Sequence, residues 1–284
     1  MKNVEAINQK KIVFVDSHGY IEKFKVILEE VGNGRLVGET GTGKTTLVHA
    51  LTEQLDAELY EIVLTRDITK WDLLASDILK AGATQTREGI ILKWLNSKSD
   101  KIKILYLDGF NYAEPSILSL IESLADFRGN VWIPELEMTL KRTDKHYLVI
   151  SYNPSEKIGY SGTFLENIAT IRRFEGLVID YIDRKDEIDL IKSYTNDYDF
   201  SVKFVEIARK TRELYRKSKL KTPLTTGNLI NYAKMKKSLS EEDLIEIASS
   251  LYPEDERPTF KRLFEEKGDI DLEKLKEEEK KEED

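Results

Sequence analysis

Short apolar runs alternate with amphipathic stretches through the first two-thirds of the chain. The apolar runs lie at residues 36–37, 59–64, 102–107, 147–151 and 177–179. None of them is longer than a typical buried strand. Helical periodicity covers residues 71–80, 89–96 and 115–127. Trp71 and Trp94 fall on helix faces that we expect to pack in the core. The alternation predicts an α/β fold in which a parallel sheet is flanked by helices.

The rest of the chain departs from this alternation. Residues 129–142, which contain Trp132, have the pattern of a hairpin inserted between a helix and the next strand. Later in the chain only helical patterns remain, at residues 185–194, 202–217, 227–236 and 241–251. We therefore predict an α/β domain over residues 1–182, a small all-helical lid domain over residues 183–253 and a charged tail over residues 254–284.

Composition narrows the class of protein. The chain has 284 residues, 40% of them hydrophobic and 34% charged, with a net charge of −8. The net negative charge argues against general binding to nucleic-acid backbones. Basic clusters such as residues 217–221 keep a nucleic-acid motor as an alternative. The absence of cysteine excludes disulfides and zinc–thiolate sites. No apolar run approaches the ~20 residues of a membrane span and no signal-peptide pattern is visible, so we expect a cytoplasmic protein.

Residues 38–45 carry the most specific chemical signal. They match the phosphate-loop pattern of a glycine, four further residues, and then Gly-Lys-Thr; the loop comprises Gly38, Glu39, Thr40, Gly41, Thr42, Gly43, Lys44 and Thr45. In such a loop the backbone N–H groups surround an anion, the lysine reaches the β- and γ-phosphates, and the threonine hydroxyl ligates Mg²⁺. A short strand precedes the loop and a helix that includes Thr46 follows it, as the pattern requires. The sequence therefore predicts a nucleoside triphosphate site.

Three later positions are candidates for the same site. An apolar strand ends at Asp108, whose carboxylate would lie beside Thr45 and hold Mg²⁺, often through water. Asn153 ends the following strand; it can orient the attacking water, close the strand in an Asn-Pro turn, or do both. Arg172 and Arg173 are either a surface or ion-pair patch, or an arginine finger for the nucleotide of a neighbouring subunit.

Together these elements resemble the AAA+ ATPases, and within them the MoxR branch, which includes the CbbQ and NorQ proteins and the dynein- and midasin-like modules. Residues 38–45 look like the Walker A loop, residues 105–108 like Walker B, and residues 108–115 like the Asp-Glu-Ile-Asn-Arg-Ala-Pro-Pro stretch of the branch. Residues 133–136 resemble the helix-2 insert of the branch, and residues 152–154 resemble its sensor-1 turn. Residues 172–174 resemble its arginine-finger region, in which Arg173 is the better match for the finger. The resemblance covers residues 4–251.

The resemblance implies a Mg²⁺-dependent ATPase that forms a homo-oligomeric ring, with a hexamer expected. Such rings remodel or activate a protein substrate, and their partners often carry a von Willebrand factor A domain. In this setting Trp132 either grips substrate in the ring pore or packs on the adjacent strand of its own hairpin.

Two positions depart from the pattern of the branch. Gly109 stands where the branch has the glutamate that polarises the attacking water, and Gly227 stands at the position of the sensor-2 arginine. Because a general base typically contributes ~10²–10⁴-fold in rate, we predict tight binding and slow hydrolysis. Glu114 and Lys221 are candidate replacements for the two missing groups. The second hypothesis is a nucleotide-gated structural subunit with little turnover.

Overall fold

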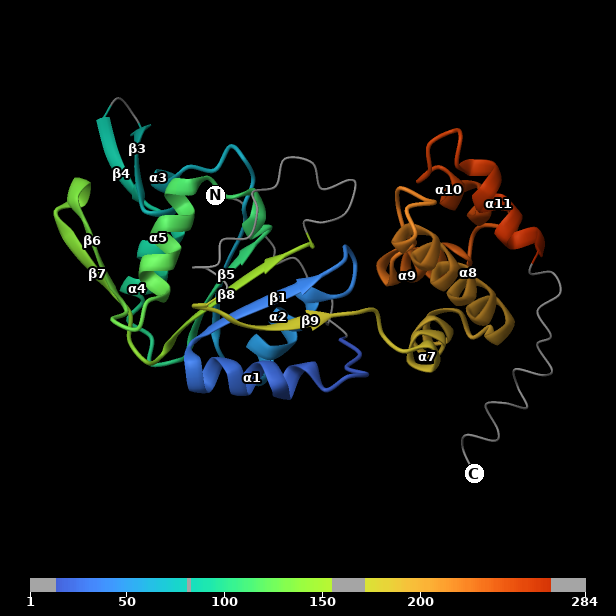
Figure 1. Ribbon diagram of the computed structural model, residues 1–284, viewed down its shortest axis with the longest axis horizontal. Helices are drawn as coiled ribbons and strands as arrows, with labels where there is room; N and C mark the ends of the chain where they lie inside the picture. The colour runs from blue at the N-terminus through green and yellow to red at the C-terminus, as the bar shows by residue number, and fades with distance from the viewer. Residues whose placement is uncertain (1–13, 81–82, 155–171, 267–284) are drawn as a thin grey trace, which may run out of the picture. The chain divides into compact units, whose positions relative to one another are not determined.

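The computed structural model describes residues 14–80, 83–154 and 172–266. The chain divides into two compact units, with the boundary between Asp180 and Tyr181 (Figure 1). The acidic end of the predicted tail, residues 277–284, lies outside the described residues.

A five-stranded parallel sheet forms the centre of the first unit, in the order β2-β5-β8-β1-β9 (Figure 1). This confirms the predicted fold class. Because all pairs are parallel, the carboxyl ends of the strands meet at the same edge of the sheet. The strands are β1 (Asn33–Gly38), β2 (Glu58–Val63), β5 (Lys103–Asp108), β8 (His146–Tyr152) and β9 (Glu175–Ile179).

Alternate side chains of the central strands fill a core on each face of the sheet. Ile104 and Tyr106 pack on one face with two helices, α1 (Tyr20–Val31) and α2 (Lys44–Gln54). Leu105 and Leu107 pack on the other face with α4 (Ile90–Asn96) and α5 (Pro115–Ala125). Trp94 of α4 is fully buried, as the sequence predicted, and its indole N–H donates to the carbonyl of Lys103 at 3.0 Å.

The predicted helix over residues 71–80 is wrong. Helix α3 (Lys70–Leu73) is short, and the chain continues into β3 (Ala75–Lys80), which pairs antiparallel with β4 (Ala83–Glu88). The partner strand lies later in the chain, so the local period of residues 71–80 could not reveal the pairing. Trp71 was expected in the core, but it is 39% exposed and the ammonium of Lys70 lies 5.3 Å from the centre of its ring.

The hairpin predicted over residues 129–142 is confirmed. It consists of β6 (Asn130–Ile133) and β7 (Met138–Lys141), joined by a 3₁₀ turn, η2 (Pro134–Leu136). Trp132 lies opposite Thr139 in the antiparallel register, and 55% of its surface is exposed. The cross-strand neighbour therefore covers only part of the indole.

The described part of the second unit, up to residue 266, contains the helices α7 (Arg184–Thr195), α8 (Tyr198–Arg216), α9 (Thr226–Met235), α10 (Glu241–Ser249) and α11 (Arg257–Glu266). The last of them was not expected from the sequence. Phe260, Leu263 and Phe264 of α11 are buried in the core of this unit, which therefore extends beyond residue 253, where the charged tail was predicted to begin. Their spacing of three and four residues places them on one face of a helix. The many charged residues between and around them hide this apolar pattern in the sequence. No helix in the described part of the chain is long and apolar enough to cross a membrane.

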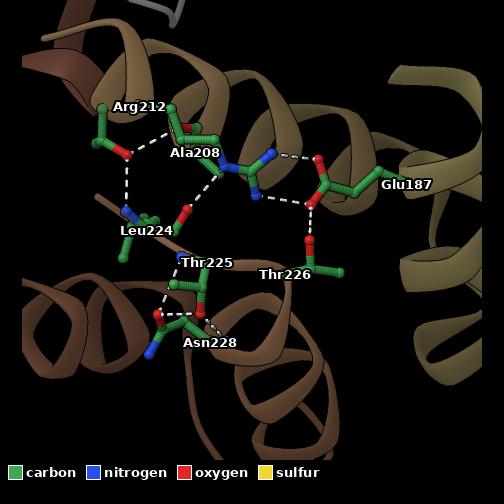
Figure 2. Close-up of polar contacts among 8 residues, drawn as sticks. Glu187, Ala208, Arg212, Leu224, Thr225, Thr226 and Asn228 are labelled. Carbon is green, nitrogen blue, oxygen red and sulfur yellow. Dashed lines mark hydrogen bonds and ion pairs between the residues drawn. The ribbon is translucent and has the colours of Figure 1, made fainter. Parts of the chain in front are cut away.

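A buried ion pair connects the helices of the second unit (Figure 2). Arg212 of α8 donates from Nη1 and Nη2 to the two carboxylate oxygens of Glu187 of α7, at 2.8 and 2.7 Å. The hydroxyl of Thr226, the first residue of α9, donates to Glu187 at 2.6 Å, and Arg212 Nε donates to the carbonyl of Leu224 at 2.9 Å. The guanidinium also lies 3.9 Å from the centre of the Tyr181 ring. Such a bidentate, fully hydrogen-bonded pair fixes the positions of three helices.

Candidate functional site

The loop between β1 and α2 depends on its glycines. Gly41 and Gly43 have φ angles of 78° and 92°, in the left-handed region that other residues rarely adopt. A Cβ on Gly38 would lie only 2.4 Å from the carbonyl oxygen of Ile179 in the neighbouring strand β9. These three positions therefore require glycine, and they turn the chain so that α2 begins at Lys44, with the N–H groups of its first turn at the loop.

Lys44 is buried, with only 8% of its surface exposed. Its ammonium donates to the carbonyls of Gly38 and Glu39 at 2.8 and 2.9 Å and to Oδ1 of Asn153 at 2.8 Å. Burial lowers the pKa of Lys44 to about 8, against the opposing effect of the charges on Asp108 and Glu39. Because these three acceptors are uncharged oxygens, no anion in the described part of the chain is shown in direct contact with the Lys44 ammonium.

A second group of side chains surrounds the carboxylate of Asp108. The Thr45 hydroxyl donates to Oδ2 of Asp108 at 3.1 Å, and the Ser151 hydroxyl donates to Oδ1 at 2.5 Å. The phenol oxygen of Tyr106 lies 2.9 Å from Ser151 Oγ and 3.2 Å from Thr45 Oγ1. Tyr106 and Ser151 are both fully buried. Burial raises the pKa of Tyr106, and the nearby charge of Asp108 adds to this effect, so the phenol keeps its proton.

Asn153 directly follows the last residue of β8 and joins the loop to the neighbouring strand end. In addition to accepting from Lys44, its amide Nδ2 donates to the Thr40 hydroxyl at 3.3 Å. Asn111 in turn donates to the backbone carbonyl of Asn153 at 3.4 Å. Lys44, Thr45, Asp108 and Asn153, which the sequence placed in one site, thus lie within one hydrogen-bonded region.

Arg172 and Arg173 lie elsewhere. The backbone carbonyl of Arg173 accepts from Asn33 Nδ2 at 3.1 Å, at the amino end of β1, whereas the phosphate loop follows its carboxyl end. At about 3.3 Å per residue, these two ends of β1 are roughly 17 Å apart. Arg172 is exposed, and the guanidinium of Arg173 lies 3.8 Å from the carboxylate of Asp126. The structure does not bring either arginine to the phosphate loop of its own chain.

The backbone at Gly109 explains why no glutamate stands there. Its φ and ψ are 73° and 35°, and a Cβ would lie 3.1 Å from the carbonyl oxygen of Leu64. A glutamate at this position would therefore be strained. Glu114, the candidate substitute, is the N-cap residue of α5. The contacts described for the side chains of Lys44 and Asp108 do not include the Glu114 carboxylate.

The sensor-2 position lies in the second unit. Gly227 is the second residue of α9, whose first turn is closed by the side chains of Thr225 and Asn228. Lys221, the candidate replacement cation, is exposed, and its ammonium lies 3.8 Å from the carboxylates of both Asp255 and Glu256.

Sequence reasoning missed the roles of Tyr106 and Ser151. Tyr106 precedes Asp108 by two residues and so shares its face of β5. Ser151 lies directly beside Asp108 in the parallel register of β5 and β8. The first relation is visible in the sequence, but the second depends on how two distant strands are aligned.

Comparison with known proteins gives one family match and several relatives. Residues 35–174 match the AAA domain of the dynein-related subfamily. An uncharacterized protein of Staphylococcus saprophyticus is 28% identical over 193 residues, which span 68% of this chain and 69% of that protein. An uncharacterized protein of Staphylococcus aureus is 29% identical over 177 residues, which span 62% of this chain and 63% of that protein. A solved structure of a Cytophaga hutchinsonii protein covers 88% of this chain and 89% of its own, with a TM-score of 0.49 and 16% identity.

The parallel sheet and the glycine-dependent loop at its carboxyl edge agree with the subfamily match. Residues 35–174 are similar to the AAA domain of the dynein-related subfamily, and this part of the chain has the sheet and loop arrangement of an AAA+ fold.

Proposed function

We propose that this protein is an ATP-binding, MoxR-like AAA+ ATPase that assembles into a homo-oligomeric ring, a hexamer by resemblance to that branch, and remodels a partner protein. The environment of Lys44 carries the proposal. Among the described residues its buried ammonium donates to three uncharged oxygens, in a loop with left-handed glycines at the start of a helix. A polyphosphate would supply the missing negative charge to this arrangement.

The residues present also fit a magnesium ion. Thr45 Oγ1 and the Asp108 carboxylate lie 3.1 Å apart, and hydroxyl and carboxylate oxygens are the ligands that Mg²⁺ prefers. Thr45 and Asp108 would hold the ion, which when bound neutralises charge on the phosphates. Lys44 would bind the β- and γ-phosphates, and Asn153, already in contact with Lys44, would orient the attacking water.

Arg173 is proposed to act on the nucleotide of the adjacent subunit. Its backbone carbonyl lies beside the amino end of β1, and the loop of its own chain begins at the carboxyl end, roughly 17 Å along the strand, which supports a role across a subunit boundary. The test mixes Lys44→Met subunits with Arg173→Ala subunits and measures ATP turnover. Each variant alone should be inactive, whereas the mixture should regain activity, because some interfaces then combine an intact loop with an intact arginine. A mixture that stays inactive while still assembling would contradict the shared site.

Turnover is proposed to be slow. With Gly109 in place of the glutamate, the carboxylate that would polarise the attacking water is missing. The left-handed backbone at this position favours glycine over a residue with a side chain. The same observation favours a second candidate function, a nucleotide-gated structural subunit whose ring is stabilised by ATP with little hydrolysis. Turnover measured with and without candidate partners, including proteins with a von Willebrand factor A domain, separates the two. Stimulation by a partner supports the remodelling ATPase.

The central experiment is calorimetric titration of ATP with Mg²⁺ into the full chain, with Lys44→Met as the matched variant. Saturable binding by the natural chain and its loss in the variant are expected. Absence of binding by the natural chain would overturn the proposed function.

A further inference from the structure

Asp108 and the three hydroxyl-bearing side chains around it, those of Thr45, Ser151 and Tyr106, form a hydrogen-bonded set in which each proton can be assigned. The carboxylate only accepts, so Thr45 and Ser151 each use their single hydroxyl proton to donate to it. Tyr106 then has one proton and two neighbouring oxygens, those of Ser151 at 2.9 Å and Thr45 at 3.2 Å. It can donate to only one of them, and the shorter contact is with Ser151.

This assignment has a direct consequence for the oxygen of Thr45. If Tyr106 donates to Ser151, the hydrogen bonds run in one direction, from Tyr106 to Ser151 to Oδ1 of Asp108. Each bond in such a chain polarises the next, which strengthens the hold on the carboxylate. The Thr45 oxygen, whose proton points to Oδ2, then keeps its lone pairs available for a cation.

We infer that Tyr106 is a positioning residue for the metal site: its hydroxyl acts through Ser151 to hold the Asp108 carboxylate in the orientation that binds Mg²⁺, and it leaves the Thr45 oxygen available to the ion. The inference rests on the proposed function. It adds a determinant of metal affinity that does not touch nucleotide or metal. Full burial of Tyr106 and Ser151 excludes bulk water as a replacement donor, so the loss of the phenol proton cannot be made good by solvent.

The test replaces Tyr106 by phenylalanine, which keeps the ring in the core and removes only the hydroxyl. Binding of a non-hydrolysable ATP analogue is measured by calorimetry at several Mg²⁺ concentrations and in EDTA. We expect the affinity for Mg²⁺ in the presence of nucleotide to fall roughly tenfold, as is typical when a residue that orients a metal ligand is removed. Nucleotide affinity in EDTA should stay unchanged, because Tyr106 reaches the loop at the Thr45 hydroxyl, which is assigned to the metal ion and not to the phosphates.

Tyr147→Phe is the matched control. Tyr147 is buried in the same core cluster as Tyr106, on the neighbouring strand, and this variant should bind Mg²⁺ like the natural chain. Ser151→Ala supplies a second, independent test, because it breaks the chain of hydrogen bonds at its middle. In the Ser151→Ala background, Tyr106→Phe should have little further effect on Mg²⁺ affinity, since the two residues act in series.

The outcomes separate this inference from the proposed function. If the natural chain binds nucleotide more tightly with Mg²⁺ and Tyr106→Phe does the same, the inference is wrong while the function stands. If Tyr106→Phe weakens binding equally with Mg²⁺ and in EDTA, Tyr106 has only a structural role and the inference is again wrong. If the natural chain binds no nucleotide, or gains nothing from Mg²⁺, both the metal assignment and the inference fail.

Discussion

Each unit of this protein buries charged side chains, but the two units treat them differently: among the described residues, the helical unit pairs two of them directly with each other. In the helical unit, Glu187 and Arg212 are nearly inaccessible and face each other in a bidentate pair. In the α/β unit, Lys44 contacts uncharged oxygens and Asp108 accepts from hydroxyls. The second arrangement holds a cation of the loop and an anion at the end of β5, each through hydrogen bonds to uncharged groups.

The difference separates a network that stabilises the fold from one that is prepared for a ligand. A buried pair with all its hydrogen bonds made has little to gain from a ligand, and it loses much when one partner is removed. A buried lysine with a lowered pKa is instead held in an unfavourable charged state that an anion would relieve. Removing the cation should therefore reduce mainly the stability of the protein in the helical unit, and mainly the affinity for nucleotide in the α/β unit.

The largest effect is expected from Arg212→Met. The substitution leaves Glu187 buried without its partner, which typically costs about 3–5 kcal/mol of stability. Urea unfolding of the full chain, followed by circular dichroism, measures the loss. Lys217→Ala, which removes a cation from an exposed pair with Glu213, is the control and should leave the transition nearly unchanged. Equal effects of the two variants would show that the buried pair does not carry the stability assigned to it.

Lys44→Met should show the reverse behaviour. Nucleotide affinity should fall at least about a hundredfold, because charge-assisted contacts to the phosphates are lost. Stability without nucleotide should change by less than about 1 kcal/mol, because removing the ammonium also removes the cost of burying it. Calorimetry and urea unfolding on the same preparation give both quantities. A large loss of stability with unchanged nucleotide affinity would make Lys44 a structural residue like Arg212.

The contrast also shows which features the sequence could predict. The parallel sheet and the loop around Lys44 were predictable because their signals are local: apolar runs, glycine spacing and the order of strand, loop and helix. The β3–β4 hairpin was missed because its pairing partner lies outside the window that suggested a helix. Helix α11 was missed because charged neighbours mask the buried face that includes Phe260.

Within the site, the limit of prediction was the alignment of strands. Lys44, Thr45 and Asp108 follow from motif positions, but the link from Tyr106 through Ser151 to Asp108 depends on the register of β5 and β8. In the helical unit the pairing of Glu187 with Arg212 likewise depends on the packing of α7 against α8. The motif around Lys44 indicated a binding site from the sequence, whereas nothing in the sequence indicated that Glu187 and Arg212 form a structural pair.

A change of pH tests the charge of Lys44 without mutation. With a pKa of about 8 in the folded protein, against 10.5 ordinarily, Lys44 loses its proton as the pH rises through 8. Nucleotide affinity should therefore fall about tenfold between pH 7 and pH 9, where roughly one molecule in ten keeps the proton. The stability of the folded protein should depend on pH in the opposite direction. The contribution of Lys44 to stability rises between pH 8 and 10.5, because in this range the unfolded chain binds the proton and the folded chain does not. Lys44→Met should lose this pH dependence of binding, and its persistence in the variant would assign the titration to another group.

The smallest effect is expected from Thr225→Ala, at the start of α9. The Thr225 side chain accepts from the backbone N–H of Asn228, and the Asn228 side chain accepts from that of Thr225, so the first turn of this helix is closed by the protein itself. Loss of such a cap costs about 1 kcal/mol, and Thr225→Ser, which keeps the hydroxyl, should be close to the natural chain in urea unfolding. Nucleotide affinity should not change in either variant. If Thr225→Ala instead weakened nucleotide binding and left stability intact, the start of α9 beside Gly227 would belong to the nucleotide site. The helical unit would then not be purely structural, and the contrast between the two units would fail at this helix.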